Sequence, residues 1–254
     1  MQSLFQLVLA ALFSLTAASS SAQSTRPPFQ MERTDRGLMF VGQISPQSVL
    51  ALEEELREDD LLIFASSGGE RHSAERLADL LVERKVRIIV NGSCFSACAL
   101  HVALGAPRVE VPEGAIVLFH SDTAMWIRAL AEHPDRFSEA DRAEIGRAHA
   151  AQIRILQRQG INPDILWCIA RAIGPRYAEM RRTPPAPAGS MSTHDVRFAI
   201  PTDFDFVWLS PAVLEHFGAR NVDVRWSLNE GGRQSYPSYT GKRIVWVDTV
   251  EQCQ

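Results

Sequence analysis

The sequence VRIIVNGSCFSACALHVALGAPR occupies residues 86–108 and contains the pattern that decides the fold. Its first five residues form a continuous apolar run of strand length, which is typical of a parallel strand buried on both faces. Asn91-Gly92 then predicts a turn, and the small residues from Ser96 to Leu104 predict a helix. Ser96 therefore lies where a buried strand gives way to a helix. Binding sites in open α/β sheets form at such junctions.

The same alternation extends on both sides of this stretch. Upstream, strands are predicted at 37–44 and 61–66, and helices at 45–57 and 72–85. Downstream, Val109 and Val111 alternate with polar residues, and AIVLFHS predicts a strand at 115–121. Strands and helices that alternate at this spacing imply right-handed crossovers. The predicted fold class is therefore α/β with a largely parallel sheet, in one domain over residues 36–228.

The later half of the chain is expected to be more helical. Helices are predicted over 138–159 and from Asn162 to about Ile173, where Gly174-Pro175 is expected to end the second one. The segments predicted after it are a Pro-rich loop at 182–192, a strand at 207–209 and a short helix at 210–217. Residues 229–254 are predicted to form a C-terminal tail with one late apolar strand at 243–248.

The N-terminus predicts export. The run from Leu4 to Ala18 is apolar but shorter than the ~20 residues that span a bilayer. Ser20-x-Ala22 follows as a small-x-small cleavage site, so residues 1–22 are predicted to be a signal peptide cleaved near Ala22. We expect a periplasmic or secreted protein with a flexible lead-in at 23–35. An uncleaved anchor is the alternative, because no Lys or Arg precedes the apolar run.

Charge and cysteine content narrow the function classes. The 26 basic and 30 acidic residues give a formal net charge of −4, which offers no electrostatic case for nucleic acid or an anionic membrane. The four cysteines are Cys94, Cys98, Cys168 and Cys253. In an oxidising compartment they predict one or two disulfides, and all three full pairings stay open. Cys94 and Cys98 can reach each other if only Cys98 is in a helix.

Three features predict a hydrolase site. Ser96 starts a helix, where the helix dipole and free N–H groups stabilise negative charge. His120 ends a buried strand and can supply the base that a serine nucleophile needs. Gly68-Gly69 opens another helix, and glycine lets backbone N–H groups approach a ligand. Each feature alone has an ordinary explanation as a cap, a turn or a solvated histidine. Together they place a serine and a histidine like a nucleophile and its base.

These motifs, taken in order, resemble the Clp protease proteolytic subunit and its crotonase superfamily. The matching segments are GQI (42–44), FASSGG (64–69), GSCFSACALHVALGAPR (92–108) and IVLFHS (116–121), within about 80 residues of sequence. The C-x-S-A-C run from Cys94 to Cys98 is similar to the bacterial exported branch of that family. The resemblance implies a spiral of β-β-α units with a largely parallel sheet.

The resemblance also implies roles for single residues. Ser96 would be the nucleophile, His120 the base, and the amides of Gly69 and Ala97 the oxyanion hole. The family places an aspartate just before an L-S helix, and two aspartates occupy that region here. Asp205 is favoured over Asp203 as the third member of a catalytic triad. Asp164 and Asp122 are poorer candidates.

The function implied is an exported serine hydrolase that cleaves peptides or unfolded polypeptides without ATP. No metal or cofactor and no ATP-dependent unfoldase partner is expected. In the family, the helix corresponding to residues 138–159 packs between subunits, so the resemblance implies a homo-oligomer.

Three alternatives remain at this stage. One is a catalytically inactive member of the fold that serves in binding or assembly, because this fold also hosts other functions such as acyl-CoA chemistry. A second is a metal site formed by Cys94, Cys98, His101 and His120, although their spacing fits no common zinc pattern. A third is a cysteine nucleophile at Cys94 or Cys98, which a disulfide would silence.

Overall fold

The structure is a computed structural model that describes residues 29–120, 123–180, 206–225, 231–234, 236 and 243–253, without the side chains of 174–180. The predicted signal peptide, the Pro-rich loop and the aspartates at 122, 203 and 205 lie outside the described residues. Within the described parts, no helix combines the length and the apolar character needed to cross a membrane.

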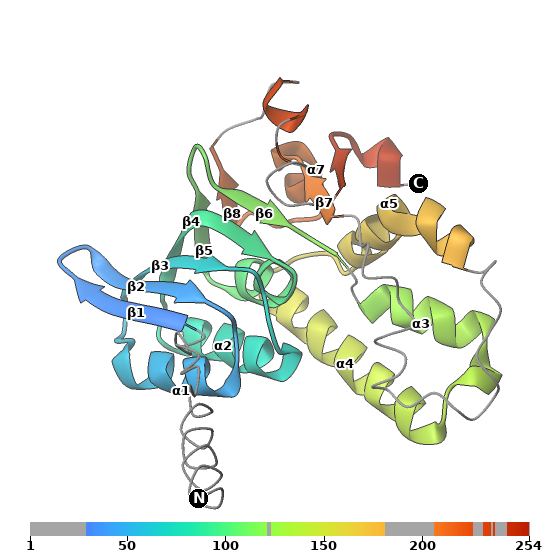
Figure 1. The fold of residues 1–254 in the computed structure, drawn as a ribbon, viewed down its shortest axis with the longest axis horizontal. Helices are drawn as coiled ribbons and strands as arrows, with labels where there is room; N and C mark the ends of the chain where they lie inside the picture. The colour runs from blue at the N-terminus through green and yellow to red at the C-terminus, as the bar shows by residue number, and fades with distance from the viewer. Residues whose placement is uncertain are drawn as a thin grey trace, which may run out of the picture.

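The main sheet joins seven strands in the described chain, in the order β1-β2-β3-β4-β5-β8 with β6 beside β4 (Figure 1). They are β1 (Phe29–Thr34), β2 (Gly37–Gly42), β3 (Leu61–Ser66), β4 (Arg87–Phe95), β5 (Arg108–Val111), β6 (Ile116–Leu118) and β8 (Val222–Val224). Strands β1 and β2 pair antiparallel, and all the other pairs of this sheet are parallel. The predicted α/β class with a largely parallel sheet is confirmed.

The helices are α1 (Pro46–Glu55), α2 (Arg71–Glu83), η1 (Cys98–Ala103), α3 (Thr123–Glu132), η2 (Pro134–Arg136), α4 (Glu139–Arg158), α5 (Asp164–Met180), α7 (Pro211–His216) and η3 (Val250–Cys253). Figure 1 shows α1 and α2 side by side against the sheet, whereas α3 and α4 pack against each other to the right of it, on the side away from β1. Capping boxes begin two of them: Ser45 caps α1 and Ser138 caps α4.

The core forms where the parallel strands pack against these helices. Leu62 and Phe64 of β3 are fully buried. Phe64 pairs in register with Phe40 of β2, and their rings stack with centroids 5.0 Å apart. Burying such large apolar side chains is the main favourable term in folding.

A second, two-stranded sheet extends the fold beside the main one. Strand β7 (Phe206–Leu209) pairs parallel with β9 (Ile244–Val247), which confirms the predicted strands at 207–209 and 243–248. Phe119, which follows β6, exchanges two backbone hydrogen bonds of 2.8 Å with Val207. The two-stranded sheet is therefore hydrogen-bonded, through β7, to the segment that carries His120.

Three sequence expectations differ from the structure. Residues 29–34, expected within the flexible lead-in, form β1, and Phe29 stacks on Phe40 at 5.8 Å. The expected turn at Asn91-Gly92 is absent, because β4 continues to Phe95. Its first residues pair with β5 and its last three pair with β6. Gly92 adopts φ +85°, so glycine serves here to change strand partners rather than to end the strand.

The third difference concerns α5. This helix does not end at Gly174-Pro175 but continues to Met180. Helix-breaking tendencies are weak priors, and α5 packs against α3 and η3. Tertiary contacts therefore outweigh the local stop signal.

Candidate active site

Ser96 occupies a sharp turn between β4 and η1. Its backbone is left-handed, with φ +57°, which costs a non-glycine residue about 1–2 kcal/mol. The Ser96 N–H donates to the carbonyl of Leu118 at 3.1 Å, and the Ser96 carbonyl accepts from the Leu100 N–H at 2.9 Å. A strained serine between a strand and a helix is the geometry of a nucleophile elbow. The half-buried side chain is presented at the strand's end.

The Gly68-Gly69 turn lies directly against Ser96. A methyl group on Gly68 would come within 2.7 Å of Ser96 Cβ and 3.1 Å of the Ala97 nitrogen. Gly68 and Gly69 both have positive φ, +97° and +151°. Only glycine fits this approach, so the structure brings together the two motifs that were 27 residues apart in sequence.

The two amides expected to form the oxyanion hole lie in these two turns. The Gly69 segment bridges to Ile44 through the Ile44 and Glu70 N–H groups, and this bridge does not use the Gly69 N–H. The Ala97 N–H is in the first turn of its helix, where backbone N–H groups have no partner within the helix. Their role as donors to a developing negative charge stays a prediction.

His120 lies at the same edge of the sheet as Ser96. Phe95, the residue before Ser96, pairs with Leu118 on the parallel strand β6, and His120 follows two residues later. The imidazole is half-buried with its Nδ1 atom shielded from solvent. Its ring meets the ring of Phe206 edge-on, with centroids 5.3 Å apart, and Phe206 in turn contacts Phe95 at 5.2 Å.

Of the four candidate aspartates, Asp164 is among the described residues. Asp203, Asp205 and Asp122 lie outside the described residues. Asp164 is exposed at the start of α5, where its N–H donates to Asn162 Oδ1 at 3.0 Å.

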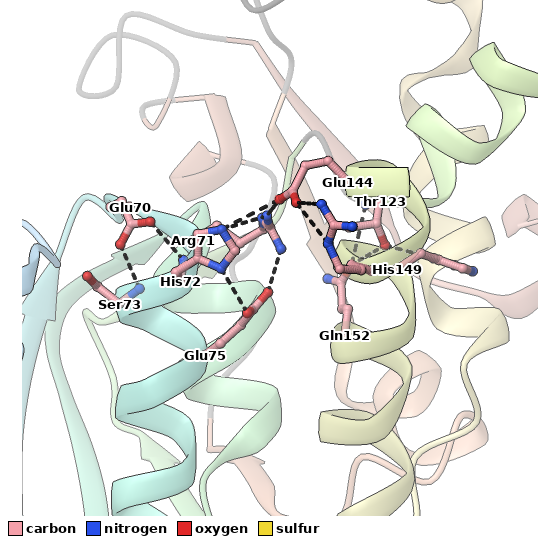
Figure 2. A network of polar contacts seen from close by, with 10 residues as sticks. Glu70, Arg71, His72, Ser73, Glu75, Thr123, Glu144, His149 and Gln152 are labelled. Carbon is pink, nitrogen blue, oxygen red and sulfur yellow. Dashed lines mark hydrogen bonds and ion pairs between the residues drawn. The ribbon is translucent and has the colours of Figure 1, made fainter. Parts of the chain in front are cut away.

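An ionic network that the sequence motifs do not reveal joins the glycine turn to α4. Figure 2 shows the side chains of Arg71 and His72 extending from the start of α2 toward Glu144 on α4. Arg71 pairs with both Glu144 and Glu75, the latter at 2.9 Å. Partial burial alone would raise the pKa of Glu144, but the hydrogen bond from Arg147 and the charges of Arg71, Arg147 and His72 lower it below its usual value. Arg71 comes two residues after Gly69, so this network links the glycine turn to α4.

A second polar cluster, also visible in Figure 2, holds the start of α3. The Thr123 hydroxyl lies 2.8 Å from His149 Nδ1 and also contacts Gln152 Oε1. The hydroxyl can donate to the amide oxygen of Gln152 while accepting from the Nδ1–H of His149. Burial lowers the pKa of His149, which favours this neutral form. The cluster fixes the chain three residues after His120.

All four cysteines are paired. Cys94 is bonded to Cys98 with Cα atoms 5.2 Å apart, and Cys168 is bonded to Cys253 with Cα atoms 4.4 Å apart. This selects one of the three possible pairings. Neither cysteine beside Ser96 carries a thiolate, so the expected alternatives of a cysteine nucleophile or a cysteine-ligated metal lose their sulfur groups.

His101, the third residue of that alternative metal site, is buried in η1. Burial, together with the positive charges of Arg71 and His72, lowers its pKa to about 3. Its Nδ1 atom has no hydrogen-bond partner among the described residues. This histidine is therefore neutral at ordinary pH, and it belongs to the packing behind Ser96.

Comparison with known proteins finds similar solved structures at low sequence identity. No family model and no curated protein matches the chain. Solved structures similar to it include a variant of ClpP1 from Listeria monocytogenes, at 18% identity over 78% of this chain and 94% of that one, with a TM-score of 0.36. A variant of the 1510-N membrane-bound stomatin-specific protease matches at 15% identity over 83% and 95%, with a TM-score of 0.39. An enoyl-CoA hydratase from Bacillus halodurans matches at 10% identity over 39% and 54%, with a TM-score of 0.28.

Both groups named by the sequence resemblance, Clp-type proteases and the enoyl-CoA hydratases of the crotonase superfamily, are therefore among the similar structures. At these identities the similarity concerns the fold.

Proposed function

We propose that this protein is an exported serine hydrolase that cleaves peptide bonds without ATP, with Ser96 as its nucleophile and His120 as its base. The observation that carries the proposal is the contact between two turns. Gly68 packs against Ser96, whose backbone is left-handed, so closely that a Cβ atom placed on Gly68 would lie 2.7 Å from Ser96 Cβ. Such a contact has no use in a simple capped helix. It supports an oxyanion hole made by the Gly69 and Ala97 amides near the Ser96 hydroxyl, which is the arrangement that acyl transfer requires.

The reaction follows from these groups. Ser96 Oγ attacks the substrate carbonyl carbon while His120 takes the hydroxyl proton, and the N–H groups of Gly69 and Ala97 stabilise the oxyanion. The carbon–nitrogen bond then breaks as His120 returns the proton to the leaving amine. Water, deprotonated by the same imidazole, attacks the acyl-enzyme ester and releases Ser96.

Asp205 is proposed as the group that orients His120. It is bonded to Phe206, whose ring packs edge-on against the imidazole. The imidazole Nδ1 atom is shielded from solvent, and a carboxylate on that side would fix the tautomer that leaves Nε2 for the serine. Asp203 is two residues more distant in the chain and is the alternative.

Export is supported by the covalent chemistry of the chain. Two disulfides consume all four cysteines, and such bonds persist in oxidising compartments. Together with the predicted signal peptide at 1–22, this favours the periplasm or the medium. No ATP is available there, so the substrates proposed are flexible or unfolded polypeptides. Assembly into a homo-oligomer through α4 is part of the same proposal.

The decisive test is covalent labelling of the mature protein with a fluorophosphonate. Ser96 Oγ would form a bond to phosphorus and expel fluoride, with the proton passing to His120. We expect labelling of the wild type and of a Ser93→Ala control, and none of Ser96→Ala. Equal labelling of Ser96→Ala, or no labelling of any of them, would overturn the hydrolase and favour a binding protein. Fractionation of cells that express the full chain tests export, and light scattering tests the oligomer.

A further inference from the structure

The disulfide between Cys94 and Cys98 encloses the nucleophile. It spans only four positions of sequence, and Ser96 is the central residue of the ring. Ala97, whose amide is the proposed oxyanion donor, is also inside it. Both half-cystines are buried, at 1% and 0% exposure. The crosslink is therefore part of the wall behind the site and does not lie on the surface.

The two ends of this ring belong to different rigid elements. Cys94 is held in the sheet, where it pairs with Ser66 of β3 and with Val117 of β6. Cys98 is the first residue of η1. The bond consequently fixes the end of the strand to the beginning of the helix across the turn that carries Ser96.

Ser96 differs from the other left-handed non-glycine residues of the described chain in being enclosed by a short disulfide ring. Only Asp59, Lys85 and Ser96 among its non-glycine residues have positive φ. Asp59 and Lys85 lie in connections between a helix and the next strand, with no crosslink around them. Strained conformations persist when the surrounding structure over-determines them. Around Ser96 the hydrogen bonds to Leu118 and from Leu100 supply part of that restraint, and the disulfide supplies a covalent part.

We propose that Cys94 and Cys98 are positioning residues, whose disulfide holds Ser96 Oγ and the Ala97 amide in the geometry that attacks a carbonyl. This inference rests on the proposed hydrolase function and adds a requirement to it. Without the bond, the turn can relax toward ordinary φ values, which moves the hydroxyl away from the Gly69 amide. Displacements of about 1 Å at a reacting centre cost roughly 100-fold in rate.

The experiment compares two double variants of the mature, oxidised protein. Cys94→Ala with Cys98→Ala removes the bond around Ser96, and Cys168→Ala with Cys253→Ala removes the distant one as the matched control. Fluorophosphonate labelling is measured over a range of probe concentrations, which separates the maximal rate constant from the apparent binding constant. A melting temperature is recorded for each protein.

We expect the first variant to lose about 100-fold in the maximal rate constant while its binding constant stays within about threefold. The control variant should keep both constants although its melting temperature falls further. Should the first variant label at the wild-type rate, the positioning role is wrong while the hydrolase stands. If the wild type itself shows no Ser96-dependent labelling, the hydrolase and the positioning role fall together.

A second measurement covers the case in which the first variant does not fold. In the Cys168→Ala/Cys253→Ala background, the one remaining disulfide is reduced with a water-soluble phosphine, which becomes its oxide as two thiols form. Mass spectrometry measures the fraction of the protein in which the Cys94–Cys98 disulfide is reduced, under conditions in which the protein stays folded. The labelling rate constant should fall in proportion to that fraction and return on reoxidation. A rate constant independent of it would contradict the proposal.

Discussion

The two disulfides join the chain in opposite ways. Cys94–Cys98 closes a ring across four positions inside the core, whereas Cys168–Cys253 connects α5 to η3 across 85 positions. In the chain-entropy model a five-residue loop contributes about 2 kcal/mol and a loop of that longer length about 4.5 kcal/mol. The long-range bond is therefore the better stabiliser of the fold. The short one restrains a single turn, which is where a reacting group gains most from restraint.

The largest expected effect is on stability and concerns the long-range bond. Replacing both Cys168 and Cys253 by Ala should lower the free energy of unfolding by about 4 kcal/mol, against about 2 kcal/mol for the Cys94 and Cys98 pair. Urea unfolding followed by circular dichroism measures both values. Equal losses for the two pairs would remove the contrast.

The next largest effect is expected from a substitution that disturbs the turn around Ser96 and leaves both disulfides intact. Gly68→Ala places a methyl group 2.7 Å from Ser96 Cβ and from the Phe95 carbonyl, so the turn has to move. We expect the fluorophosphonate labelling rate to fall by about 100-fold, as for the loss of one oxyanion donor. Gly146→Ala on α4 meets no atom within 4 Å and serves as the control. Unchanged labelling of Gly68→Ala would show that the contact between the turns is not needed.

Acid should weaken the region around Ser96 through His101. The pKa of this buried histidine is lowered to about 3, mainly by burial, from an unfolded value near 6.5. Between these two values the unfolded chain binds one more proton, so stability is lost as the pH falls, by up to about 1.4 kcal/mol per pH unit. His101→Leu should remove about 2 kcal/mol of the loss between pH 6.5 and pH 5. Urea midpoints at the two pH values measure it, and an identical pH slope in the variant would exclude His101 as the source.

The smallest effect is expected from the ionic network of α2 and α4. Its side chains range from 16% to 69% exposed, and ion pairs this close to solvent contribute less than about 1 kcal/mol each. Glu144→Gln should therefore cost about 0.5 kcal/mol at pH 7 and nothing once the carboxyl is protonated. Because the pKa of Glu144 is lowered, the wild-type advantage is present above the ordinary glutamate pKa and disappears below it. The free energy of unfolding lost by Glu144→Gln should be the same whether or not either disulfide is removed. A double-mutant cycle would check this.

Local sequence predicted many of the alternating strands and helices. Continuous apolar runs identified β3 and the first four residues of β4, and the helices predicted at 45–57 and 138–159 correspond to α1 and α4. Helix α3 and strand β8 were not anticipated. The alternating residues of β1 were read as part of a flexible lead-in, because a polar, Pro-containing segment precedes them. Their pairing with β2 supplies the contacts that make them a strand.

Part of the candidate site could also be predicted from local sequence. Ser96, His120 and the Gly68-Gly69 pair each stand at the end of a recognisable element, and parallel strands bring such ends to one edge. The ionic link from Arg71 to Glu144 could not be predicted, because these residues are 73 positions apart and nothing near either one signals the other.

The sequence by itself determined most of the order of strands and helices, the largely parallel α/β class, and which serine and histidine are candidates for the site. Those properties depend on short-range patterns of apolar, small and capping residues. Tertiary structure alone decided that β4 changes partners at Gly92, that Cys94 pairs with Cys98, and that Ser96 takes a left-handed backbone against Gly68. The physical reason is that a strained turn is stable only when several separate segments hold it together, and their meeting is not encoded in any one of them.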